Sequence, residues 1–301
     1  TVRNVAVGPH GRIEGALLLE EGTVAGTRVA PATIGEGVIA RRFIVLSGSV
    51  VDGGAMLTRT FVGQGVRIGR QFSAENSAFF ANCEAFYGEA CSVFAGPYTV
   101  THHKSTLLIA AMFSFFNAGS GTNQSNHMYK LGPLHQGVME RGAKTGSSSY
   151  LLWPGHIGAF TVVIGKHYSN FDTSDLPFSY ITESGGRSVL TPAMNLFAVG
   201  TQRDSAKWPG RDRRADPDKL DLIVFDFLSP YTIGKVLRAI ELLRGLHDKA
   251  PKKAEFVAHK GIAIKRQLVR NACRHYELAV NVFIGEQLAS RIKGLATDAS
   301  L

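Results

Sequence analysis

The chain has 301 residues, 45% of them hydrophobic, so it is long enough to bury a large core. Its 33 Lys and Arg against 24 Asp and Glu give a net charge of +9, but no zinc-finger, RNA-recognition or helix-turn-helix signature accompanies it, which argues against nucleic acid as a partner. Three cysteines without a Cys-x-x-Cys motif exclude a paired disulfide framework and favour a reducing, cytoplasmic location. The longest apolar run, Leu107 to Phe116, is too short to cross a membrane.

A six-residue period dominates the first half of the chain. Residues 1–33 contain short apolar pieces separated by glycine-rich turns, as expected of atypical coils that cap a stack. One register of small or apolar residues then holds Val50, Met56, Val62, Ile68, Ala74, Phe80 and Phe86. A second register, four residues later, holds Thr60, Val66, Phe72, Ala78 and Ala90. Helices and ordinary strands have periods of 3.6 and 2.0, so this pattern predicts a parallel β-helix, in which short strands stack coil upon coil.

The repeats resemble those of a known superfamily. The stretches 34–39 and 61–69 are similar to the hexapeptide repeat of left-handed β-helix proteins, which include acyltransferases, γ-class carbonic anhydrases and parts of sugar-nucleotide enzymes. Residues 119–180, and further on 228–232, more closely resemble a bacterial hexapeptide-repeat family of unknown function. The resemblance implies a mainly β fold, a left-handed parallel β-helix with a C-terminal α-helical extension. It brings no established reaction with it.

The pattern changes twice after Gly96. The apolar run Leu107–Phe116 is predicted to be either a buried strand pair or a short helix, and periodicity does not choose between them. Residues 119–149 are rich in Gly, Ser, Asn, Thr and His, as is typical of functional loops, and strand-like repeats resume at Ile157. We divide the chain into a β-helix with a His-rich loop insertion (1–180), an irregular linker (181–230) and a helical extension (231–301).

Helical periodicity appears only in the last part of the chain. One apolar stripe is formed by Ile233, Val236, Leu237, Ile240, Leu243 and Leu246. A second helix is predicted from about Gln267 to Lys293, with an apolar stripe that includes Cys273, Leu278, Val282, Phe283 and Leu288. Both stripes are predicted to be core or subunit interface.

Histidines are the first candidates for chemistry, because an imidazole exchanges protons near neutral pH. Six candidates, all outside the predicted helices, are His102, His103, His127, His135, His156 and His167. In the acyltransferases that the repeat resembles, a histidine acts as general base. We assign that catalytic role to His127 and His135, since each lies among groups that could orient an imidazole. The alternative is that each simply satisfies loop carbonyl groups.

The predicted substrate-binding set surrounds these two histidines and extends to the next coils. Its cations could hold a phosphate or carboxylate, or could be ordinary solvated surface. The set consists of Asn123, Gln124, Asn126, Lys130, Arg141, Lys144, His156 and His167. The carboxylates Glu140, Asp172 and Asp175 could orient a histidine, although the stretch 172–175 is equally typical of a turn or helix cap. No His-x4-His spacing like that of γ-class carbonic anhydrases occurs, and a metal site stays open.

The leading hypothesis is acyl transfer from acetyl-CoA or another acyl-CoA to a sugar or sugar-nucleotide-like acceptor, with a phosphorylated sugar as the small-molecule partner. The alternatives are a noncatalytic β-helix module for binding or assembly, and a sugar-nucleotide-related or metal-dependent enzyme. A homo-oligomer is expected under either hypothesis, and no membrane partner is predicted. The chain begins at Thr1, so it could also be part of a longer protein.

Overall fold

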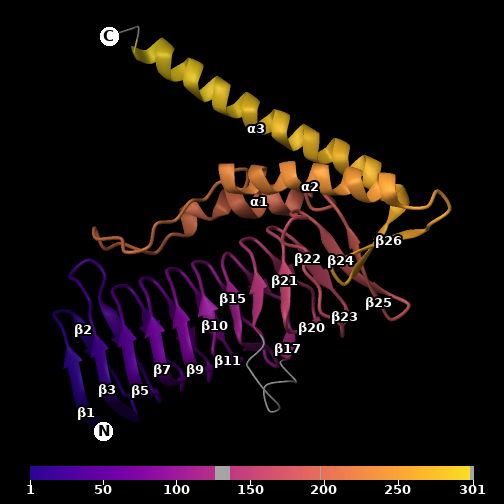
Figure 1. The fold of residues 1–301 in the computed structure, drawn as a ribbon. Helices are drawn as coiled ribbons and strands as arrows, with labels where there is room; N and C mark the ends of the chain where they lie inside the picture. The colour runs from indigo at the N-terminus through magenta and orange to yellow at the C-terminus, as the bar shows by residue number, and fades with distance from the viewer. Residues whose placement is uncertain (126–135, 197, 299–301) are drawn as a thin grey trace.

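The computed structural model describes residues 1–125, 136–196 and 198–298, and in it the strands stack into a solenoid with helices along one side (Figure 1). The longer path of the first sheet, sheet A, is β1 (Val2–Val7), β3 (Leu18–Val24), β5 (Ile39–Val45), β7 (Met56–Val62), β9 (Ser73–Phe79), β11 (Glu89–Cys91), β14 (Leu107–Ile109), β17 (Asn123–Ser125), β20 (Tyr150–Leu152) and β23 (Lys166–His167). Its remaining strands are β12 (Phe94–Ala95), β15 (Ala111–Phe113), β18 (Gly137–Met139) and β21 (Gly155–Ile157).

The second sheet, sheet B, forms a further face of the solenoid. Its strands, in spatial order, are β2 (Gly11–Ile13), β4 (Ala32–Ile34), β6 (Val50–Val51), β8 (Arg67–Gly69), β10 (Glu84–Phe86), β13 (Val100–Thr101), β16 (Asn117–Ala118), β19 (Lys144–Thr145), β22 (Val162–Ile164), β24 (Tyr180–Ser184), β25 (Arg187–Thr191), β27 (Ile262–Lys265) and β26 (Phe256–His259). Strand β9 pairs in parallel with both β11 and β12, so sheet A divides into two faces and the later coils have three sides.

Each regular coil holds 17 residues, because Ile39 pairs with Met56 and Met56 with Ser73. Three strict hexads would need 18 residues, so the inward positions step by five as well as by six. The predicted register is therefore correct at Val62, Ile68 and Ala74, which are buried. It is wrong by one residue at Val50, Met56, Phe80 and Phe86, whose neighbours Val51, Leu57, Phe79 and Ala85 are the ones that point into the core.

The apolar run Leu107–Phe116 forms strands and not a helix. It contributes β14 and β15, which lie in consecutive sides of one coil and pair with different strands, β11 and β12. Between them Ala110 adopts a φ of +49°, which turns the chain at the corner. Leu108 and Phe113 point into the core, so the run continues the solenoid.

The segment 181–230, predicted as an irregular linker, is partly ordered into regular elements. Strands β24 and β25 form an antiparallel pair that extends sheet B, and the chain then forms α1 (Val199–Lys207) and the short 3-10 helix η1 (Pro209–Arg211). The chain from residue 212 to residue 228 runs back along the solenoid beside α1 (Figure 1). This segment therefore covers part of sheet B instead of only connecting two regions.

Both predicted C-terminal helices are present. They are α2 (Pro230–Lys249), and α3 (Val269–Asp298), which follows the 3-10 helix η2 (Arg266–Leu268). Ser229 caps α2 in a reciprocal capping box with Thr232, and Pro230 occupies its first turn. Ile233, Ile240 and Leu243 are buried within the chain, so most of the α2 stripe is core.

The helices are fastened to the last coils of the solenoid. Tyr276 of α3 is fully buried and donates a hydrogen bond from its hydroxyl to the Pro177 carbonyl at 2.5 Å. The predicted fold class, mainly β with a parallel β-helix and a C-terminal helical extension, is confirmed. Among the described residues, no helix is long and apolar enough to span a membrane.

Candidate functional site

A cleft of about 660 Å³ lies between the outer face of sheet B and the segment from Asp204 to Arg213. One wall is a row of outward-facing residues, one from each of five consecutive coils, which pair in register along the sheet. The row is Arg67, Glu84, Val100, Asn117 and Lys144. The opposite wall is provided by α1, Trp208 and the chain that follows η1. The regular stacking of coils thus brings polar residues distant in sequence to one surface.

A carboxylate–imidazole pair lies in this cleft. Nε2 of His102, the residue just after β13, is 2.5 Å from Oε2 of Glu84 on β10. The other carboxylate oxygen accepts a hydrogen bond from the Arg213 guanidinium at 2.5 Å. The hydrogen bond from His102 lowers the pKa of Glu84, and the charge of Arg213 lowers it further, so Glu84 stays ionised near neutral pH. An ionised Glu84 fixes the orientation of the imidazole ring.

Cations surround the pair. Arg213 also donates to the carbonyl groups of Gly65 and Asn82, each at 2.9 Å, so it fastens the covering segment to the coil edge. Lys144 is paired with Asp204 of α1. Arg67 and Arg211 line the cleft without an ion pair to any residue that the structure describes. These two guanidinium groups are therefore available to an anionic ligand.

The remaining wall of the cleft is aromatic. The ring centroids of Phe115 and Trp208 are 4.4 Å apart, and those of Phe115 and Tyr98 are 5.1 Å apart. The Tyr98 hydroxyl donates to the Trp208 carbonyl at 2.9 Å, and burial raises the pKa of Tyr98 to about 12. The guanidinium of Arg141 lies over Phe115, with a distance of 5.0 Å to the ring centroid. Stacked rings of this kind make a rigid apolar surface next to the charged groups.

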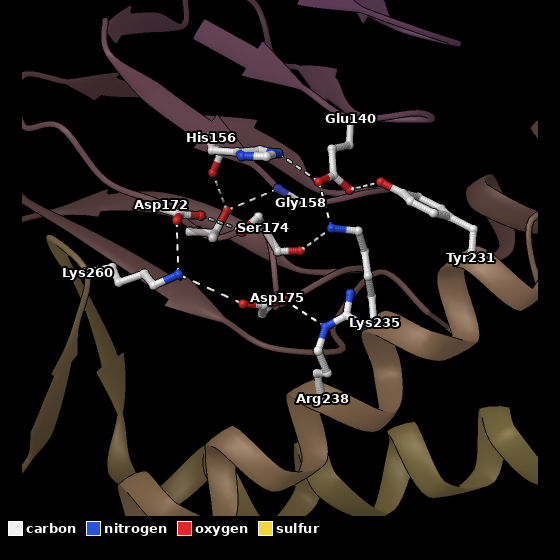
Figure 2. Close-up of polar contacts among 11 residues, drawn as sticks. Glu140, His156, Gly158, Asp172, Ser174, Asp175, Tyr231, Lys235, Arg238 and Lys260 are labelled. Carbon is white, nitrogen blue, oxygen red and sulfur yellow. Dashed lines mark hydrogen bonds and ion pairs between the residues drawn. The ribbon is translucent and has the colours of Figure 1, made fainter.

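A second polar cluster, the Glu140 network, joins the solenoid to α2 (Figure 2). Glu140 accepts hydrogen bonds from the Lys235 ammonium at 2.7 Å, from His156 Nε2 at 2.7 Å and from the Tyr231 hydroxyl at 3.0 Å. Lys235 also donates to the Ser174 carbonyl at 2.8 Å. The side chains of Glu140 and Lys235 are only 7% and 8% exposed. Both carboxylate oxygens are engaged by the protein itself, so this network holds α2 in place.

The electrostatics of Glu140 agree with that role. Burial alone would raise its pKa, but the hydrogen bonds from His156, Lys235 and Tyr231 outweigh the burial and lower it. Next to the network, Asp172 forms an ion pair with Lys260 at 3.0 Å, and Asp175 forms one with Arg238 at 3.1 Å. These outer pairs are more exposed than the Glu140–Lys235 pair.

A larger and shallower hollow of about 1010 Å³ lies over the first coils on the sheet A side. Its floor includes Phe61 and Phe94, and its rim includes Arg42 and Arg59. None of the residues that line it is a histidine. The cleft over sheet B, although smaller, combines an acid–base pair, cations and aromatic rings, and we therefore take it as the candidate site.

The structure separates the residues that the sequence groups together. Lys144 lines the cleft, Arg141 supports its aromatic wall from behind, and His156 belongs to the Glu140 network. Gln124 and His167 are buried: the Gln124 side chain accepts from the Ile109 amide, and His167 contacts Ser188 and the Ile164 carbonyl. Asn123 is exposed on β17 of sheet A. The predicted residues His127, His135, Asn126 and Lys130 lie outside the described residues.

Several cleft residues were not selected from the sequence. No site role is predicted for Glu84, Arg67 or Trp208 from the sequence, and His102 is only one of six candidate histidines. The usable signal is the coil length, since Glu84 and His102 are 18 residues apart, close to one coil.

Burial lowers the pKa of His167, which keeps it neutral and structural. No group of three or more His, Cys, Asp or Glu side chains that could hold a metal ion occurs within the described ranges.

Comparisons with known proteins give a family and a distant structural similarity. The model of a family described as "Domain of unknown function (DUF4954)" matches residues 1–247. Among solved structures, the chain is similar to an Arabidopsis UDP-N-acetylglucosamine acyltransferase, with 13% sequence identity and a TM-score of 0.31, over 86% of this chain and 98% of that chain. The comparison with curated proteins found no match.

Proposed function

The chain belongs to the family described as a domain of unknown function, DUF4954, and from its cleft we propose that it is a transferase for an anionic small molecule, with His102 as general base. The observation that carries this proposal is the Glu84–His102 pair beside two unpaired arginines in one cleft. The reaction we propose is acyl transfer from a coenzyme A thioester to a sugar or sugar-nucleotide-like acceptor.

The chemistry follows from the tautomer that Glu84 selects. With the proton on Nε2 directed at the Glu84 carboxylate, Nδ1 of His102 is the nitrogen that accepts a proton. It takes the proton from the acceptor hydroxyl or amine as that oxygen or nitrogen attacks the thioester carbonyl. A C–O or C–N bond forms, the C–S bond breaks, and the leaving thiolate takes the proton back from His102.

The walls of the cleft fit the proposed substrates. Arg67 and Arg211 provide two guanidinium groups for phosphate oxygens, which both the coenzyme and a sugar nucleotide carry. Phe115 and Trp208 line the cleft but are almost fully buried, so they give its apolar wall a fixed shape. The volume, about 660 Å³, is in the range of small-molecule sites.

Replacement of His102 tests the proposal. We expect His102→Asn to reduce turnover by a factor of about 10² to 10⁴, the usual contribution of a general base. Glu84→Gln should cause a smaller loss, since it leaves the imidazole but removes its orienting charge. The measurement is thiol release from acetyl-CoA with a panel of UDP-sugars as acceptors. His103→Asn is the matched control, because His103 is the adjacent residue and is also exposed.

Binding measurements distinguish a site that only binds an anionic ligand from one that also transfers an acyl group. Arg67→Gln should weaken binding of coenzyme A or of UDP-N-acetylglucosamine in calorimetry while leaving the fold unchanged. Equal turnover in His102→Asn and His103→Asn would remove His102 from the mechanism. Binding without any thiol release across the panel would reject acyl transfer and favour a ligand-binding module.

A further inference from the structure

Strand β10 contacts the His102 imidazole at two places. Glu84 binds its Nε2, and two residues further along the strand the ring of Phe86 stacks on it, with centroids 5.3 Å apart and an interplanar angle of 29°. The register explains this contact. Ala85 pairs with Thr101 across sheet B, and the two stacked rings belong to the residues that follow this pair. The imidazole is thus held at one edge and against one face.

The position of Phe86 is not explained by the core. In β10 the core position is filled by Ala85, which is 1% exposed, whereas Phe86 is partly buried on the outer face of the solenoid. The Arg70 guanidinium, from the coil before β10, lies 5.1 Å from the centroid of the Phe86 ring, and His102 comes from the coil after it. The cleft is lined by Glu84 and His102 but not by Phe86. The Phe86 ring is therefore placed to hold the imidazole and not to contact a ligand.

The contact with Glu84 alone holds the imidazole weakly. The side chains of His102 and Glu84 are 42% and 22% exposed, and pairs that water reaches contribute little. A single hydrogen bond also lets the ring turn about the axis of that bond, which moves the other nitrogen, Nδ1. A second contact, against the face of the ring, removes this freedom, and a stacked aromatic pair is comparable in strength to an exposed ion pair.

We propose that Phe86 is a positioning residue, which fixes the plane of the His102 imidazole so that Nδ1 stays directed at the acceptor group. This inference rests on the proposed function, because it takes His102 as the general base. A displacement of about 1 Å at a reacting group can cost a factor of about 10² in rate. Loss of the stacked ring therefore affects turnover although Phe86 touches no ligand.

The test combines turnover with NMR relaxation of the imidazole. Phe86→Leu keeps an apolar side chain but removes the planar ring. It should lower kcat by a factor of about 10 to 10² and leave KM unchanged, since the contacts with substrate remain. The order parameter of the Cδ2–H bond of His102, measured by ¹³C relaxation, should fall from a value typical of rigid groups to below about 0.6. Phe86→Tyr keeps the ring and should restore both values.

Phe80→Leu is the matched control, because Phe80 is also a partly buried aromatic residue on the outer face of the solenoid, where it contacts Phe61 and Phe94. It should change neither kcat nor the order parameter of His102. The NMR measurement needs no substrate, so it tests Phe86 even if the wild type releases no thiol, a result that would reject acyl transfer itself. An imidazole equally rigid in Phe86→Leu, or a kcat equal to that of the wild type, would overturn the role of Phe86.

Discussion

Lys235→Met is expected to reduce the free energy of unfolding by about 3–5 kcal/mol, since it leaves a buried carboxylate without its cation. Lys235 and Glu140 are both almost fully buried, and the ammonium bridges Glu140 to the Ser174 carbonyl. Methionine matches the length of the lysine stem but supplies no donor. Urea denaturation followed by circular dichroism at pH 7 measures the loss.

The same network predicts a dependence on pH. The folded-state pKa of Glu140 is lowered, so the carboxylate contributes stability above the pKa of about 4.3 that it has in the unfolded chain. That contribution is lost as the pH falls through the lower, folded-state pKa. Glu140→Gln should therefore lose less stability than the wild type as the pH falls below about 4.3, because one carboxylate fewer takes up a proton on unfolding.

Two further variants serve as controls for Lys235→Met. Arg238→Gln removes a cation from the same helix, but its ion pair with Asp175 is exposed, so it should cost less than about 1 kcal/mol. The double variant Glu140→Gln/Lys235→Met should recover part of the loss, because it leaves no buried charge. If Lys235→Met costs no more than Arg238→Gln, the network does not hold α2 to the solenoid.

The fold could be predicted from the sequence because a stacked coil repeats its core. Each coil must place a small or apolar residue at every inward position, and this period remains visible even in a single sequence. The register, that is, which residue of each repeat points inward, is harder to predict. Each coil of 17 residues takes two steps of six and one of five, so a strict hexad moves to the outward neighbour at Met56 and Phe80 while it stays correct at Val62. Local spacing alone cannot show which side of the coil takes the five-residue step.

The candidate site could not be predicted in the same way. Polar residues that cluster along the chain are concentrated in 119–149, and they favour that stretch as the site. The row that lines the cleft is instead assembled across coils, with Arg67, Glu84 and Asn117 each on a different strand. Its second wall comes from α1 and Trp208, more than 100 residues after Glu84. Such contacts depend on how the covering segment docks, for which the sequence contains no periodic signal.

Trp208→Ala is expected to release the covering segment and to open the cleft. The Trp208 side chain is buried against Phe115 and Phe160, with ring centroids 4.4 and 6.1 Å away. Truncation of a buried tryptophan costs about 3–5 kcal/mol, a large share of the 5–15 kcal/mol that stabilises a typical domain. Because the contacts within the stacked coils do not involve Trp208, the loss should fall mainly on the segment that carries Asp204, Arg211 and Arg213.

Limited trypsin digestion provides the measurement, since Arg211, Arg213 and Lys219 lie in this segment. Trp208→Ala should be cut there faster than the wild type, and it should lose affinity for coenzyme A if the cleft binds that ligand. Tyr98→Phe is the matched control: it keeps the aromatic wall and removes only the hydrogen bond to the Trp208 carbonyl, at a cost of about 1 kcal/mol. An unchanged digestion pattern in Trp208→Ala, together with lower global stability, would mean that Trp208 fills the core without holding the cleft closed.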